Sequence, residues 1–285
     1  MAGIVMISSY PKSGNTWFRI FLTNLMVDKE MPASINTIKT QGIAAGREIF
    51  DVITGIEASD LTFDEIDNIR PDVYKYIASK SENTIFMKIH DAYTFLENGD
   101  PLIPSDGIKA IYIIRNPLDV VVSYSYHCNC SIDEAISDLC NKNCCFYGEN
   151  GKLNWHLKQK LLTWSGHVES WVDNAEMSVH IIRYEDMKNN PFETFKRAAI
   201  FSGLSYEDEK IKKAIEFSDF KILNKEEKKN GFKEKIAIDS LFFRKGKIGD
   251  WRNYLSEEQV SLIIKEHKII MKRFGYLDDK ENVIY

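Results

Sequence analysis

The feature of this sequence that most constrains its fold is a short apolar run that leads through a polar loop into an amphipathic stretch. The run covers residues 4–7 and the loop residues 8–16, after which apolar side chains recur at helical spacing up to Met26. A buried strand that passes directly into a helix is the opening unit of an α/β fold with a parallel sheet. The first turn of such a helix offers free N–H groups and the positive end of the helix dipole, which favour anions.

Three further apolar runs are short and flanked by polar residues, as buried parallel strands are. They cover residues 85–89, 110–114 and 179–182. Helical periodicity predicts helices over 192–202 and 257–274, whereas the charged stretch 221–235 is predicted to be a solvated, mobile loop. With no repeat and no linker, the sequence predicts a single α/β domain over residues 1–285, with a central, mostly parallel sheet flanked by helices.

Composition limits the possible partners. Hydrophobic residues make up 44% and charged residues 28% of the chain, which is typical of a globular protein. The net charge of −5 argues against a basic surface for nucleic acid, so an anion requires a local group of donors. No apolar run is long enough to span a membrane and no signal peptide is evident, so we expect a cytoplasmic protein.

All five cysteines fall between Cys128 and Cys145. An odd number without a signal peptide argues against a disulfide framework. Their spacing matches no common zinc pattern, so we expect a structural role and no metal, with a metal site as the alternative.

The first loop has the composition of an anion site. Lys12 supplies a positive charge, Gly14 permits close approach of the backbone, and side-chain donors follow the lysine. These donors are Ser13, Asn15 and Thr16. The lysine precedes the glycine, unlike the order in the G-x-x-x-x-G-K-[ST] loop, which argues against a kinase or ATPase. An ordinary capped strand–turn–helix is the alternative interpretation.

The string YPKSGNTW at residues 10–17 resembles the 5′-phosphosulfate loop of sulfotransferases that use 3′-phosphoadenosine-5′-phosphosulfate (PAPS). The resemblance implies a P-loop-like phosphosulfate-binding loop in which Lys12 contacts the oxygen that bridges phosphate and sulfate. It also implies that Trp17 stacks on the adenine.

A second signature follows the predicted strand that ends at Ile114. Arg115 stands at its carboxyl end, where open α/β sheets bind ligands, and Ser123 falls about two turns into the next helix. A guanidinium suits a terminal phosphate, and the resemblance assigns both residues to the 3′-phosphate of PAPS. A surface salt bridge and an ordinary helical serine are the alternative.

A third signature combines three basic residues with two glycines over residues 243–251, as expected of a loop that closes over an anion. It is similar to the family's Arg-Lys-Gly element, which implies that Arg244, Lys245 and Gly246 bind the 3′-phosphate. Trp251 is expected to pack, and a solvated basic loop is the alternative.

Two weaker matches complete the nucleotide site. Tyr184 opens a Tyr-Glu-Asp stretch whose tyrosine, by the resemblance, meets the adenine. Ser218 and Phe220 resemble residues that pack on the base, although this sequence has Ser and Asp where the family has Thr and Ser. Core packing of both aromatic residues is the alternative. Residues 33–83 match no motif, and in this family such regions usually line the acceptor pocket.

His90 is the candidate general base. It follows the strand predicted over 85–89, and an imidazole can accept a proton near neutral pH. Lys88 and His90 match the family's Lys-x-His, in which the histidine is the base, and Asp91 could orient the ring. The other histidines match no motif.

The resemblance therefore predicts in-line transfer of the sulfuryl group from PAPS to a small molecule, which releases adenosine 3′,5′-bisphosphate (PAP). His90 deprotonates a hydroxyl or an amine, and Lys12 with Lys88 neutralises the developing charge without a metal. The alternatives are a P-loop phosphotransferase that needs ATP and magnesium, and a non-catalytic module that binds PAPS or PAP. The first loop and the Lys-x-His-Asp-Ala-Tyr run of residues 88–93 look closer to bacterial small-molecule sulfotransferases than to vertebrate ones. Either a monomer or a homodimer is compatible with the sequence.

Overall fold

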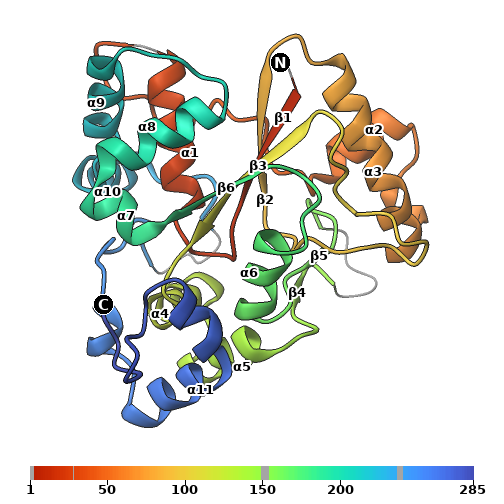
Figure 1. Ribbon diagram of the computed structural model, residues 1–285. Helices are drawn as coiled ribbons and strands as arrows, with labels where there is room; N and C mark the ends of the chain where they lie inside the picture. Colours follow the sequence, from red (N-terminus) through yellow and green to blue (C-terminus); the bar gives the residue numbers. More distant parts are fainter. Residues whose placement is uncertain (1–2, 28, 149–153, 236–239) are drawn as a thin grey trace. The chain divides into compact units, whose positions relative to one another are not determined.

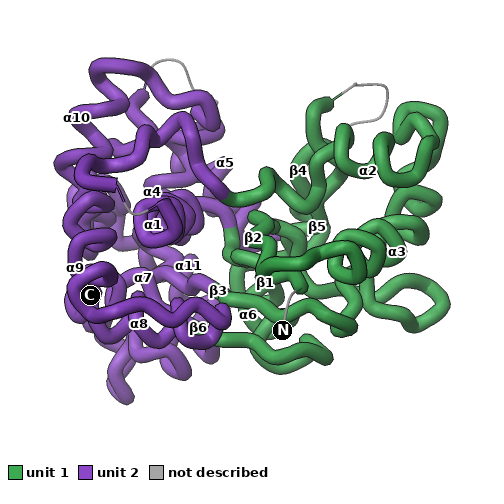
Figure 2. The backbone as a smooth tube through the Cα atoms, turned by 90° about the horizontal axis from the view of Figure 1, so that it is seen from above, with its two compact units in different colours: residues 1–10, 40–112, 142–181 green, residues 11–39, 113–141, 182–285 purple. Residues whose placement is uncertain are grey.

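The computed structural model describes residues 3–27, 29–148, 154–235 and 240–285. The chain forms two compact units, which are coloured separately in Figure 2. Unit 1 comprises Met1–Tyr10, Thr40–Tyr112 and Lys142–Ile181. Unit 2 comprises Pro11–Lys39, Ile113–Asn141 and Ile182–Tyr285. Each is described below by itself.

The central sheet has the strand order β2-β1-β3-β6 (Figure 1). Its strands are β1 (Gly3–Ser8), β2 (Thr84–Ile89), β3 (Ile108–Ile114) and β6 (Val179–Arg183). Strand β1 pairs in parallel with β2 on one side, where Ser8 is opposite Ile89, and with β3 on the other, where Ser8 is opposite Tyr112. The predicted parallel α/β fold is confirmed, and the strands lie where the apolar runs predicted them.

Unit 1 adds helices and a small second sheet to the strands. These elements are α2 (Arg47–Thr54), the 3-10 turn η1 (Ala58–Asp60), α3 (Phe63–Lys80), β4 (Cys145–Phe146), β5 (Gln159–Lys160) and α6 (Trp164–Val172). Helix α3 begins with a capping box between Thr62 and Glu65 and packs against β1. Strands β4 and β5 pair antiparallel.

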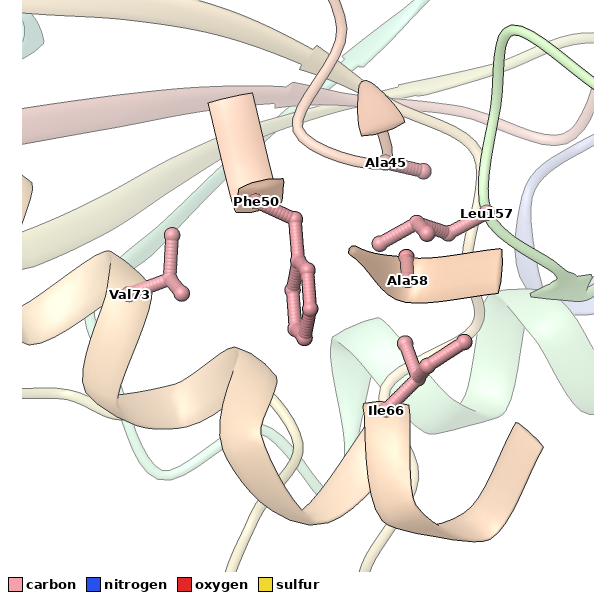
Figure 3. Packing of buried hydrophobic residues seen from close by; sticks show 6 residues of the cluster. All are labelled: Ala45, Phe50, Ala58, Ile66, Val73 and Leu157. Carbon is pink, nitrogen blue, oxygen red and sulfur yellow. The ribbon is translucent and has the colours of Figure 1, made fainter. Parts of the chain in front are cut away.

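The aromatic ring of Phe50 fills the apolar space between α2 and α3. The Phe50 side chain projects into the middle of a buried cluster that also contains Ile66 and Val73 of α3 and Leu157 (Figure 3). Ala45 and Ala58 complete it with small side chains that leave room for the ring. Through Leu157, the cluster attaches α2 and α3 to the segment that directly precedes β5.

Unit 2 is mainly helical. Its helices are α1 (Asn15–Val27), α4 (Pro117–Cys128), α5 (Ile132–Cys140), α7 (Tyr184–Asn189), α8 (Pro191–Phe201), α9 (Asp208–Phe217), α10 (Phe220–Asn230), the 3-10 turn η2 (Asp250–Asn253) and α11 (Glu257–Arg273). The centre of the Phe195 ring on α8 lies 4.3 Å from the centre of the Phe21 ring and 5.9 Å from that of the Phe18 ring, both on α1. The helices predicted after the first loop, near 192–202 and near 257–274, are confirmed.

The prediction of a loop over residues 221–235 is wrong for most of this stretch, because α10 covers Phe220–Asn230. The Asp219 side chain caps its first turn by accepting from the Lys221 N–H at 2.8 Å. Leu223 packs with Phe243 and other apolar residues, and the carboxylate of Glu227 is 3% exposed. Only one narrow face of the helix is buried, so the charged residues on its other faces concealed the periodicity.

None of the five cysteines forms a disulfide, and one of them is buried. Within the described ranges, no group of histidine, cysteine or acidic side chains is arranged to hold a metal ion. Likewise, no helix among the described residues is long and apolar enough to cross a membrane.

His267 on α11 makes the stability of the fold sensitive to acid. The side chain is 1% exposed, and burial lowers its pKa to about 4, while Cys140 Sγ lies 3.8 Å from its Nε2. The unfolded chain binds this proton near pH 6.5, so between about pH 6.5 and pH 4 the unfolded state holds more protons and stability falls as the pH falls.

We therefore expect His267 to contribute about 1–2 kcal/mol to the loss of unfolding free energy between about pH 7 and pH 5. Urea unfolding of the wild type and of a His267→Gln variant at both pH values measures this contribution. The variant should lose less stability on acidification. Equal losses in the two proteins would show that burial does not keep this imidazole neutral.

Candidate functional site

The loop between β1 and α1 has an unusual backbone. Lys12 adopts a left-handed conformation with φ of 69°, and Gly14 has φ of 109°. A Cβ atom on Gly14 would lie 2.8 Å from the Tyr184 ring, so this position admits only glycine. Strain of this kind in a non-glycine residue is typical of functional loops. Asn15 begins α1, and the buried Ser13 and Thr16 flank it.

Arg115 joins three segments of unit 2. It follows β3 directly, as predicted, and its Nη1 donates to the Lys12 carbonyl at 3.1 Å. Its Nη2 donates to the Lys247 carbonyl at 3.3 Å, and the guanidinium lies 4.3 Å from the centre of the Tyr184 ring. The Asp119 carboxylate lies 3.8 Å away, one helical turn along the chain. The first and third signatures therefore converge on the second.

The aromatic residues predicted for the base also lie together. The rings of Trp17 and Tyr184 meet edge to face at 5.6 Å, and Trp17 Nε1 donates to the Ser218 carbonyl at 2.8 Å. The Ser218 hydroxyl is buried and donates to the Ala214 carbonyl, which indicates that it anchors the chain. Its predicted contact with the nucleotide stays a prediction.

Gly246 is pressed against the ring of Phe220. A Cβ atom there would come within 2.4 Å of the ring, and φ is 59°. Gly246 belongs to the third signature, residues 243–251, which we call the basic loop. This loop can lie on the ring of Phe220 only because Gly246 has no side chain.

Lys188 belongs to the same group as Trp17 and Phe220, although no sequence motif points to it. Its ammonium lies 5.2 Å from the centre of the Trp17 ring and 5.7 Å from that of Phe220. Burial lowers the pKa of Lys188, and the nearby Asp219 carboxylate opposes this effect. The available signal was its place four residues after Tyr184, one turn along α7.

The basic loop is braced by residues to which the sequence motifs assign no role. Arg244 donates to the Tyr254 hydroxyl at 2.8 Å and to Asp250 at 3.3 Å, and Lys245 contacts the same two side chains. The hydrogen bond from Lys245 lowers the pKa of Tyr254. The Asp119 carboxylate accepts from the main-chain N–H groups of Gly249 and Trp251 at 2.8 and 3.1 Å.

A pocket in unit 2 brings Lys12, Ser123 and Arg244 to one place. Phe242 also lines it, and the Lys12 ammonium lies 3.7 Å from the centre of that ring. Two predicted donors, Ser13 Oγ and Arg115 Nε, are buried and have no hydrogen-bond partner among the described residues. Because buried polar atoms are nearly always satisfied, these atoms fit a ligand that is rich in acceptor oxygens.

His90 belongs to unit 1 and is 8% exposed. Its Nδ1 lies 2.8 Å from the Ser9 carbonyl. A carbonyl only accepts, so Nδ1 carries the proton and Nε2 carries the lone pair that a general base requires. Ser9 is also the third residue before Lys12 in the chain.

Both carboxylate oxygens of Asp91 accept from Arg70, and a role of Asp91 in orienting the His90 ring stays a prediction. Lys88 is the penultimate residue of β2, where its N–H and carbonyl pair with Gly42 and Ala44. The structure therefore gathers the predicted nucleotide residues in unit 2, and it holds Lys88 and His90 at the end of β2 in unit 1.

A parallel α/β sheet, a strained loop before a helix and three basic elements that converge in unit 2 are typical of proteins that bind phosphorylated nucleotides. Comparison with known proteins names the family. The sulfotransferase domain model matches residues 3–275. The chain therefore belongs to the sulfotransferase family, and the enzyme class predicted from its motifs is confirmed.

Individual relatives agree with this assignment. Flavonol 4′-sulfotransferase of Flaveria chlorifolia is 30% identical over 92% of this chain and 77% of its own length. Cytosolic sulfotransferase 17 of Arabidopsis thaliana is 26% identical over 96% of this chain and 76% of its own length. The fold is similar to that of retinol dehydratase in complex with androsterone and inactive cofactor PAP, with a TM-score of 0.58, 21% identity and coverage of 94% and 80% of the two chains.

A Gly246→Ala substitution tests the contact between the basic loop and Phe220. The left-handed backbone costs an alanine about 1–2 kcal/mol, and the overlap with the ring adds about 1–3 kcal/mol. Gly55→Ala is the control, because Gly55 has a left-handed backbone with φ of 68° and a Cβ there would meet no atom within 4 Å. Urea unfolding should show the larger loss for Gly246→Ala. Equal losses would mean that the ring moves aside freely.

Proposed function

We propose that this protein transfers the sulfuryl group of PAPS to a hydroxyl or amine of a small-molecule acceptor and releases PAP. The observation that carries the proposal is the convergence of Lys12, Arg115 and the loop of Arg244 within unit 2. Three cations from distant parts of the sequence match a ligand with two separate anionic groups. The membership of the sulfotransferase family supports the same donor.

In this proposal the residues of the first loop bind the phosphosulfate. Lys12 lies next to the oxygen that bridges phosphate and sulfate and neutralises the charge that develops there. Ser13, Asn15, Thr16 and the N–H groups of the first turn of α1 bind the remaining oxygens. Ser13 Oγ, which has no hydrogen-bond partner in the described part of the chain, supports this role.

Arg115 and Ser123 bind the 3′-phosphate of PAPS together with the basic loop. The ligands from that loop are Arg244, Lys245 and the backbone of Gly246. The adenine stacks on Trp17 beside Tyr184 and Phe220, with Ser218 holding Trp17 in place. Because Lys188 lies over two of these rings, its ammonium either donates to the edge of the base or moves away when the base enters.

His90 acts as the general base through Nε2. The Ser9 carbonyl fixes the tautomer that supports this role, and the chain that carries this carbonyl continues directly into the donor loop. The acceptor oxygen or nitrogen loses its proton to Nε2 and forms a bond to sulfur while the bond from sulfur to the bridging oxygen breaks. Lys12 and Lys88 stabilise the departing PAP, and no metal takes part.

The proposal also covers the domain organisation and the cellular location of the enzyme. We infer that residues 1–285 work as one catalytic domain, because the family model covers nearly the whole range. The name of the Arabidopsis relative, a cytosolic sulfotransferase, supports a cytoplasmic enzyme. We propose no nucleic-acid or membrane partner, and we leave monomer and homodimer as alternatives.

Calorimetric titration with PAP, with AMP and with ATP plus magnesium tests the donor site. We expect PAP to bind more tightly than AMP, because only PAP offers the 3′-phosphate to Arg115 and the basic loop. An Arg115→Met variant should lose most of this difference, while AMP binding changes little. A preference for ATP and magnesium would instead support a phosphotransferase.

A His90→Ala variant tests the base. Turnover with PAPS and a panel of phenols, alcohols and amines should fall by about 10²–10⁴-fold, the usual range for loss of a positioned base. Affinity for PAP should stay within about twofold, since the proposed nucleotide ligands belong to unit 2. Lys12→Ala is the comparison and should weaken both. An active His90→Ala enzyme would exclude this histidine as the base, and unchanged PAP affinity with no wild-type turnover would favour a binding module.

A further inference from the structure

A buried charged pair stands beside His90, and the proposed reaction makes no use of it. Arg70 on α3 is 1% exposed and Asp91 is fully buried. The two side chains form a bidentate pair, with Nη1 3.1 Å from Oδ1 and Nη2 2.8 Å from Oδ2. Burial opposes the charged form of Arg70, but the charge and hydrogen bonds of Asp91, together with Tyr74 and Asp67, outweigh it, so the pKa of the guanidinium is raised.

Stability alone does not explain such a pair. Removal of two charges from water costs free energy that their attraction barely offsets, and well-packed apolar residues of similar size often serve the fold equally well. A bidentate guanidinium differs from an apolar pair in one respect, because it fixes direction as well as distance. The geometry that this pair fixes is that of Asp91, the residue next to His90.

The main chain on both sides of the Asp91 Cα atom is held by other buried donors. Trp171 Nε1 donates to the Asp91 carbonyl at 3.0 Å, and His167 Nε2 lies 3.0 Å from the His90 carbonyl. That carbonyl only accepts, so His167 carries its proton on Nε2, and its Nδ1 accepts from the Tyr112 hydroxyl at 2.9 Å. Burial lowers the pKa of His167 to about 4, which keeps this ring neutral in its bridging role.

Arg70 also reaches β2 by a second route. Its Nε donates to the Tyr74 hydroxyl at 3.0 Å, and that hydroxyl donates to the Ala44 carbonyl at 3.3 Å. The N–H of Ala44 donates to the Lys88 carbonyl at 2.7 Å. Helix α3 is therefore connected to the end of β2 through the Asp91 side chain and through the main chain of Lys88.

Two further contacts keep the guanidinium in place. Asp67 accepts from Nη1 at 3.3 Å, and the Lys158 carbonyl accepts from the same nitrogen at 3.3 Å. Lys160 pairs with the second oxygen of Asp67 at 2.9 Å, so the excess negative charge is balanced. With its partners on several sides, Arg70 cannot turn away from Asp91 without leaving a buried charge unpaired.

We propose that Arg70 is a positioning residue for the sulfuryl transfer: its bidentate pair with Asp91 fixes the main chain at the end of β2 and thereby aims Nε2 of His90. The inference rests on the proposed function, because it concerns the base of that reaction. Arg70 does not touch the reacting atoms. Arg70 acts on the main chain of His90 through Asp91, whereas the Ser9 carbonyl acts on the His90 ring through Nδ1.

The test replaces the ion pair by an apolar pair of similar size. The variants are Arg70→Met, Asp91→Leu and the double variant that carries both. Each single variant leaves one buried charge unpaired and should be strongly destabilised. The double variant removes both charges and should regain most of the stability, which urea unfolding measures.

The two roles predict different kinetics for the double variant. A positioning role predicts that kcat stays about 10- to 100-fold below the wild type, because a shift of about 1 Å in a catalytic group has an effect of this size. The KM for PAPS and the affinity for PAP should stay within about threefold. Recovery of kcat together with stability would overturn the proposal and leave the pair a purely structural role.

An NMR measurement tests the orientation of His90 without an acceptor substrate. Long-range ¹H–¹⁵N spectra of the imidazoles, with the His90 signals assigned by a His90→Gln variant, report which ring nitrogen carries the proton. We expect one tautomer in the wild type, protonated on Nδ1, and a mixture in the double variant. An unchanged His90 spectrum in a folded double variant would contradict the proposal.

Two control variants distinguish a positioning role of Arg70 from a general effect on stability. Ile66→Ala on the same helix truncates the apolar cluster, which typically costs about 2–5 kcal/mol, and should leave kcat of the folded enzyme unchanged. Arg70→Lys keeps the charge but loses the bidentate geometry, so kcat should fall here as well, even if the double variant does not fold. If the wild type itself fails to bind PAP, the proposed function fails first, whereas wild-type activity with unaffected Arg70 variants refutes only the inference about Arg70.

Discussion

The parallel pairing of β1 with a strand on either side is the constraint on which the rest of the molecule depends. It aligns Ser8, the last residue of β1, with Ile89, the last residue of β2, so the chain leaves both strands at the same end of the sheet. Main-chain groups there are no longer used by the ladder and can take other partners. The Ser9 carbonyl is one such group, and its partner is the ring of His90.

Several polar side chains in this protein are buried and held by specific partners. Arg70, Asp91 and His167 are all almost inaccessible to water, yet each has identified partners. In unit 2, Asp119 performs a comparable task by accepting two main-chain N–H groups of the basic loop. Satisfied polar networks of this kind hold loops rigidly where apolar packing alone would allow several arrangements.

The sequence predicted the parts of this structure that depend on local patterns. The strands, the first helix and the three basic elements follow from apolar runs, glycine positions and charge, and the structure brings the predicted nucleotide residues together in unit 2. The pair of Arg70 with Asp91 could not be predicted, because the two residues are 21 positions apart and Arg70 stands in no recognisable motif. Helix α10 was missed for a different reason, since its buried face consists of little more than Leu223 and Glu227, four positions apart.

Helix α10 has a consequence for how this protein can be handled in the laboratory. The carboxylate of Glu227 accepts from the N–H groups of Phe242 and Phe243 at 2.7 and 2.8 Å, immediately before the basic loop. Lys228 and Lys229, the next two residues, are exposed and flexible enough to oppose ordered lattice contacts. Alanine at these two lysines is therefore a suitable surface change for crystal growth, whereas the glutamate before them must be kept because it holds the start of the basic loop.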